Sequence, residues 1–159
     1  MLQRKAIERQ TLELLILLLQ ELLINVNTLN AYFKIAGKNV KVDFLAHKYP
    51  LLFPVEKLDN IDFLSVPDVA AMKLNAIIGR GSKKDFYDIY ELLEHYSLND
   101  LVEFYKCKYP NFNPVIILKS LQYFNDAENT PAPITLNELE WDEVKEKIIF
   151  EVKKYIDNL

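Results

Sequence analysis

The sequence predicts an α+β fold in which a small antiparallel sheet, formed by a hairpin and a third short strand, packs with about six helices. Residues 28–45 alternate between apolar and polar side chains around a glycine-containing turn, which is the pattern of a β-hairpin. From residue 65 onward, apolar residues recur at helical spacing in several separate segments. The 159 residues suit a single domain, with a helix and the sheet in residues 1–64 and the helical part in residues 65–159.

The first helix is expected over residues 3–23. Its body lies in an apolar run from Thr11 to Ile24 that is interrupted only by Glu13, Gln20 and Glu21. This run is shorter than the roughly 20 residues that a bilayer requires, and no small-residue cleavage site of a signal peptide follows it. We therefore expect a buried helix that is covered on more than one face, and no membrane segment.

The strands follow the first helix and are expected at residues 28–35, 40–45 and 61–64. Residues 36–39 contain Gly37 and form the turn of the hairpin. Residues 46–60 are expected to be irregular, because Pro50 and Pro54 exclude long regular structure.

Serine residues mark the starts of the next helices, as N-caps do. Ser65 is followed three residues later by Asp68, which is the spacing of a capping box, and its helix should stop at Gly79. The remaining helices are expected at residues 83–95, 97–105, 115–124 and 141–156, with a loop at 126–137.

The composition excludes some classes of function. A net charge of −4 argues against a protein that coats nucleic acid nonspecifically, although a local basic pocket stays possible. The single cysteine, Cys107, excludes an internal disulfide and a zinc site built from cysteines, and it fits a reducing cytoplasm.

Cations gather around the Gly79-Arg80-Gly81 joint between two expected helices. Lys73 stands in an apolar helix, where it either lays its stem along apolar surface or binds a phosphate. Arg80 lies seven residues further on the same side, so the two cations could bracket an anion. Lys83 and Lys84 begin the next helix, whose free N–H groups also favour anions.

Three carboxylates accompany these cations, and each has an ordinary alternative. Asp85 and Asp88 lie on one helical face, where they either neutralise the cations as ion pairs, orient them, or take part in proton transfer. Asp43 lies in the second hairpin strand. Its spacing alone favours a side chain that faces solvent, and the functional alternative is a magnesium ligand.

Two stretches resemble the nucleotidyltransferase AbiEii/AbiGii toxin family of bacterial abortive-infection and toxin–antitoxin systems. They are VKVDFL at residues 40–45 and IDFLSVPDVAAMKLNAIIGRGSKKDFYDIYELL at residues 61–93, and the resemblance extends from about residue 25 to the C-terminus. It implies a nucleotidyltransferase-like fold and the transfer of a nucleotide, with Mg²⁺, from a nucleoside triphosphate to a target such as a tRNA end. It also implies that an antitoxin is a possible partner.

The same resemblance implies roles for individual residues. Asp43 corresponds to the third metal-binding carboxylate of the family's sheet, and Lys73 and Asp85 correspond to its catalytic lysine and aspartate. The substrate-binding residues are then expected to be Arg80, Lys83, Lys84 and Asp88.

The chain departs from the family pattern before Asp43. Family members carry a Gly-Gly or Gly-Ser segment and then two aspartates spaced D-x-D, whereas residues 1–42 contain one glycine and no aspartate. A lone carboxylate cannot build the usual two-metal site. We therefore expect a truncated member that does not catalyse transfer alone.

The alternative is a non-catalytic module that binds a phosphate, a nucleotide or a protein. Such a module would self-associate or pair with a chain that supplies the missing motif. The residues expected to carry self-association are Leu14, Leu15, Leu18, Leu22 and the hairpin edge.

Overall fold

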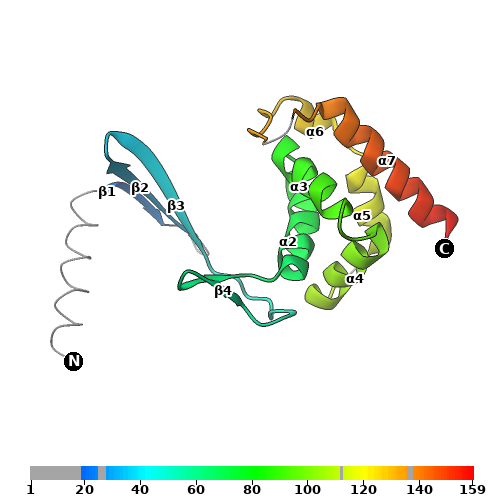
Figure 1. The fold of residues 1–159 in the computed structure, drawn as a ribbon, viewed down its shortest axis with the longest axis horizontal. Coiled ribbons are helices and arrows are strands. Elements are labelled where there is room, and N and C mark those ends of the chain that lie inside the picture. Colours follow the sequence, from blue (N-terminus) through cyan, green and yellow to red (C-terminus); the bar gives the residue numbers. More distant parts are fainter. Residues whose placement is uncertain (1–18, 25–27, 112, 136–137) are drawn as a thin grey trace. The chain divides into compact units, whose positions relative to one another are not determined.

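The computed structural model describes residues 19–24, 28–111, 113–135 and 138–159 (Figure 1). The chain divides into two compact units, residues 1–48 and 49–159, and each is described by itself. The predicted α+β class, with small antiparallel sheets and several helices, is confirmed. The expectation of a single domain stays a prediction.

The first unit contains a three-stranded antiparallel sheet in the order β1-β2-β3. Strand β1 is Leu19–Ile24, β2 is Thr28–Ile35 and β3 is Lys38–Leu45. The predicted hairpin is thus confirmed, and its turn residues Ala36 and Gly37 both have positive φ, as tight hairpin turns require.

The prediction of a helix through residue 23 is wrong at its C-terminal end. Leu19–Ile24 pairs antiparallel with β2, and a register shift between Leu19 and Glu21 marks a bulge. Leucine-rich segments favour helices locally, but here the open edge of β2 offers backbone partners that override this preference. The rest of the expected helix, with Leu14, Leu15 and Leu18, lies outside the described residues.

The second unit opens with a two-stranded sheet, and only one of its two strands is predicted from the sequence. The expected strand is present as β5 (Ile61–Phe63), but it pairs with β4 (Glu56–Leu58) instead of with the hairpin. The region expected to be irregular therefore contains a strand. Asp59 and Asn60 form the turn between β4 and β5, and both have positive φ, a conformation that Asp and Asn tolerate better than most residues.

The helices of the second unit follow as α2 to α7 (Figure 1). Their bounds are Val66–Gly79 for α2, Lys83–Leu93 for α3, Leu98–Lys108 for α4, Pro114–Leu121 for α5, Asn125–Glu128 for α6 and Trp141–Asp157 for α7. The short α6 occupies part of the expected loop. Helix α2 packs against α3, α4 and α5. Ala70 and Ala71 are fully buried in this helix, and such small side chains permit close approach of its neighbours.

A buried ion pair joins α2 to α4, and the sequence reading missed it. The Lys108 Nζ atom lies 2.5 Å from Asp68 Oδ1, and both side chains are fully inaccessible to solvent. Burial by itself raises the pKa of Asp68. The hydrogen bond from Lys108, together with bonds from nearby N–H and O–H groups, instead holds this pKa well below its ordinary value.

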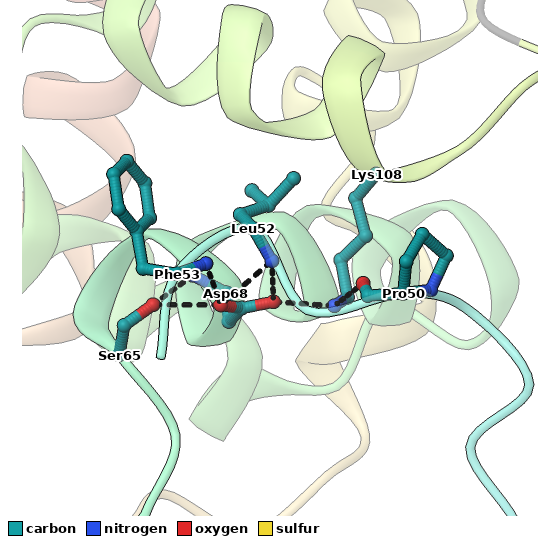
Figure 2. A network of polar contacts seen from close by, with 6 residues as sticks. All are labelled: Pro50, Leu52, Phe53, Ser65, Asp68 and Lys108. Carbon is teal, nitrogen blue, oxygen red and sulfur yellow. Dashed lines mark hydrogen bonds and ion pairs between the residues drawn. The ribbon is translucent and has the colours of Figure 1, made fainter. Parts of the chain in front are cut away.

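The same pair fastens an irregular segment to the helices, as Figure 2 shows. The Asp68 carboxylate accepts hydrogen bonds from the backbone N–H groups of Leu52 and Phe53 and from the Ser65 hydroxyl. Lys108 also donates to the carbonyl oxygen of Pro50 at 3.0 Å. Asp68 thus serves both as part of the α2 cap and as the centre of a clamp on residues 50–53.

Candidate functional site

The joint between α2 and α3 brings the predicted charges onto two neighbouring helices. Helix α2 ends at Gly79, Arg80 is its C-cap, and Ser82 precedes α3. Gly81 has a φ of +51°, and a Cβ atom there would meet the carbonyl oxygen of Ile77 at 3.4 Å. Glycine is therefore the residue that this tight reversal accepts most easily.

Arg80 and Asp85 form a two-point ion pair across the joint. Arg80 Nε donates to Asp85 Oδ2 at 2.9 Å, and Arg80 Nη2 donates to Asp85 Oδ1 at 2.9 Å. The Ser82 hydroxyl donates to Oδ2 at 2.5 Å. The Asp85 side chain is fully buried, whereas 58% of the Arg80 side chain is exposed, so the carboxylate holds a guanidinium that faces solvent.

The surroundings of Asp85 keep it ionised. Burial raises its pKa, but the hydrogen bonds from Arg80 and Ser82 and the positive charges of Arg80 and Lys73 lower it below the ordinary value. A carboxylate with a lowered pKa is a poor proton donor near neutral pH. Of the alternatives for Asp85, the ion pair is present, and a catalytic role stays a prediction.

Lys73 and Asp88 form a second pair between the same helices. Lys73 Nζ lies 2.5 Å from Asp88 Oδ2, with the two side chains 31% and 42% exposed. Together with Arg80 and Asp85, these residues make two ion pairs between α2, with its C-cap, and α3, and we call these four residues the charge ladder. The two cations that were predicted to bracket an anion, Lys73 and Arg80, are therefore each paired with a carboxylate of α3.

The two lysines at the start of α3 behave differently from each other. Lys83 Nζ donates to the carbonyl oxygen of Glu128 and lies 5.5 Å from the centre of the Trp141 ring, so its ammonium is held near α6 and α7. Lys84 is exposed and has no ion pair within the described part of the chain. Lys84 and Asp88 both line a hollow of about 560 Å³ on α3, and Arg80 lines another of about 290 Å³.

Asp43 belongs to the first unit, and its predicted role as a metal-binding and catalytic residue stays a prediction. Its carboxylate accepts hydrogen bonds from Asn30 Nδ2 at 2.6 Å and from Lys41 Nζ at 2.8 Å, and 38% of the side chain is exposed. Among the residues with described positions, no group of three or more His, Cys, Asp and Glu side chains could hold a metal ion. A single carboxylate that already accepts from an amide and an ammonium does not fit a Mg²⁺ site by itself.

Within the described residues, no helix combines the length and the apolar character that a bilayer crossing requires.

Comparison with known proteins adds two findings. The model of the family described as "Nucleotidyl transferase AbiEii toxin, Type IV TA system" matches residues 24–158. An uncharacterized protein of Aquifex aeolicus (strain VF5) is 38% identical over 125 residues, a match that covers 75% of this chain and 59% of that relative. The chain thus spans about three fifths of the length of this relative. No solved structure matches the chain.

Proposed function

Because the chain belongs to the AbiEii nucleotidyltransferase toxin family, we propose that it supplies the nucleotide-binding part of a nucleotidyltransferase toxin. The observation that supports this proposal is the charge ladder, which lies within the family match and presents two cations between neighbouring helices. We assign the triphosphate of a nucleoside triphosphate to Lys73 and Arg80. Lys84 is exposed beside Asp88 and adds positive charge to the approach.

In the charge ladder, a phosphate group can replace a carboxylate as the partner of a cation. Arg80 uses Nε and one Nη group for Asp85, and a guanidinium carries five N–H donors, so further donors remain for a phosphate. Asp88 is half-exposed and neutralises Lys73 until a phosphate displaces it. Asp85 remains in place as the residue that orients Arg80.

In this proposal the chain does not transfer nucleotides alone. The printed sequence contains no D-x-D pair, and Asp43 by itself does not fit a Mg²⁺ site. A nucleotidyl-transfer reaction that uses Mg²⁺ therefore needs carboxylates supplied by another chain or segment. The tRNA acceptor, the antitoxin partner and the cytoplasmic location belong to this proposal on the strength of the family and of the unpaired Cys107.

The binding test is isothermal titration calorimetry with each of the four ribonucleoside triphosphates. Lys73→Ala is expected to weaken binding about tenfold or more, because one charge-assisted contact to the phosphates is lost. Lys153→Ala, which removes an exposed lysine of α7, is the matched control and should leave affinity unchanged. Equal affinities of the native chain and Lys73→Ala would contradict the assignment of the triphosphate to the charge ladder.

The same preparations separate binding from catalysis. With labelled nucleoside triphosphate and bulk RNA, the native chain is expected to transfer no label. Label that is transferred by the native chain and lost in Asp43→Ala would show autonomous catalysis and contradict this part of the proposal.

Self-association is a second candidate function, which the exposed side chains of β4 and β5 favour. All six residues of these strands are exposed, among them Leu58, Ile61 and Phe63. Because a two-stranded ribbon is marginally stable in water, a second copy of the chain that covers it would stabilise it. Light scattering after size exclusion should give at least twice the monomer mass of 18.6 kDa, and Ile61→Ser should lower it. A native chain that is strictly monomeric contradicts this candidate.

A further inference from the structure

The hollow that Arg80 lines is a distinct feature at the end of the charge ladder. It has a volume of about 290 Å³, and it is lined by the C-terminal end of α2, the last turn of α5, Tyr123 and α6. Its polar side chains belong to Arg80, Lys119, Ser120, Tyr123 and Asp126. Four of these five residues come from a part of the chain to which the sequence reading assigned no function.

The side chains from α5 and α6 are available to a ligand. Lys119 and Asp126 are exposed, and within the described part of the chain neither forms an ion pair or a side-chain hydrogen bond. The Tyr123 side chain is 52% exposed and packs against no other described aromatic ring. The hollow therefore offers a cation, a carboxylate and a flat aromatic surface in one place.

The last residues of α2, 77–79, also line this hollow. The N–H groups of Arg80 and Gly81 both donate to the carbonyl oxygen of Ala76. The carbonyls of residues 77–79 therefore receive no hydrogen bond from the described backbone that follows them, as is common in the last turn of a helix. Such carbonyls, like the Asp126 carboxylate, attract N–H donors and repel bare anions.

This mixture of groups selects the chemistry of the ligand. A simple anion is attracted by Arg80 and Lys119 but repelled by Asp126 and by the carbonyl end of α2. A nucleotide carries phosphate oxygens for the cations, a π-face for Tyr123 and, when its base has an exocyclic amino group, N–H donors for the acceptors. The ligand that satisfies all of these groups together is a nucleotide with an amino-bearing base.

We infer that this hollow is the base-recognition subsite of the chain and that Tyr123, Lys119 and Asp126 determine which nucleotide binds. The inference rests on the proposed function, because Arg80 lines this hollow and also binds the triphosphate in that proposal. Tyr123 stacks on the base, Lys119 and Arg80 bind phosphate oxygens, and Asp126 accepts from the amino group of adenine, cytosine or guanine. Uracil has no exocyclic amino group, so UTP is the ligand that this subsite accepts least well.

Calorimetric titration with ATP, CTP, GTP, UTP and inorganic tripolyphosphate tests the inference. Tyr123→Ala should weaken ATP binding about tenfold and leave tripolyphosphate unchanged, because stacking requires a base. Tyr123→Phe keeps the ring and should bind as the native chain does. Lys119→Ala should weaken both ligands, with Lys153→Ala as the matched control. Asp126→Asn should reduce the difference in affinity between UTP and the three nucleotides whose bases carry an amino group.

The outcomes distinguish this inference from the proposed function. Loss of affinity in Lys73→Ala but not in Tyr123→Ala or Lys119→Ala would retain nucleotide binding and overturn the subsite. The same titration with a short single-stranded oligoribonucleotide identifies the source of the nucleotide. Tighter binding of the oligomer, with the same response to Tyr123→Ala, would assign the subsite to an acceptor strand and overturn its assignment to the nucleoside triphosphate. A native chain that binds none of these ligands overturns both proposals.

Discussion

Lys108→Met is expected to lower the free energy of unfolding by about 3–5 kcal/mol, because it leaves the fully buried Asp68 carboxylate without its ammonium partner. The contact between Lys108 and the Pro50 carbonyl is lost as well, so the segment at residues 50–53 loses one of its attachments. Urea unfolding followed by circular dichroism at 222 nm measures the effect as a shift of the midpoint.

The matched control is Lys106→Met on the same helix. Lys106 pairs with Glu103, and both side chains are about half-exposed, so its replacement should change stability by less than about 1 kcal/mol. A double variant with Lys108→Met and Asp68→Leu removes both charges and should recover part of the lost stability. Equal midpoints for Lys106→Met and Lys108→Met would show that the buried pair contributes no more than a surface pair.

The second large effect is expected in the pH dependence of stability. The pKa of Asp68 is lowered in the folded chain relative to about 3.9 in the unfolded chain. Its contribution is therefore complete above about pH 5 and is lost as the pH falls through the unfolded-state pKa toward the folded-state pKa. Asp68→Asn imitates the protonated carboxyl, so it should destabilise the chain at pH 7 by on the order of 2 kcal/mol and much less at pH 2–3.

The test compares urea midpoints of the native chain and Asp68→Asn at intervals from pH 7 to pH 2. Asp85 also has a lowered pKa and weakens both proteins in acid, so the difference between their midpoints isolates Asp68. A difference that stays constant over this range would mean that folding does not lower the pKa of Asp68.

Local sequence patterns were sufficient for much of the fold. Ser65 and Asp68 marked the start of α2, and Gly79 marked its end, because caps are read from a few neighbouring residues. The hairpin was predictable because alternation and a glycine turn are also local signals. Strand β1 was not predictable, since its conformation depends on the open edge of β2 and its own residues favour a helix.

The sequence was sufficient to identify the residues of the charge ladder, but it only partly predicted which cation pairs with which carboxylate. Lys73, Arg80, Asp85 and Asp88 were all singled out by charge and spacing, and the structure gives each cation a single carboxylate. No local pattern could reveal the pair of Asp68 and Lys108, which are 40 residues apart in the sequence. The hollow around Tyr123 was not predicted for the same reason, because it forms only where residues of α5 and α6 lie beside the end of α2 in the folded chain.

The clamp at Asp68 also constrains how the sequence can change over evolution. The loss of one member leaves a buried charge, whereas the joint loss of both leaves none and costs less stability, so a single replacement at either position is the most damaging change. Related chains should therefore keep both residues or exchange both together, and an alignment in which the two positions vary independently would show that a single replacement costs little.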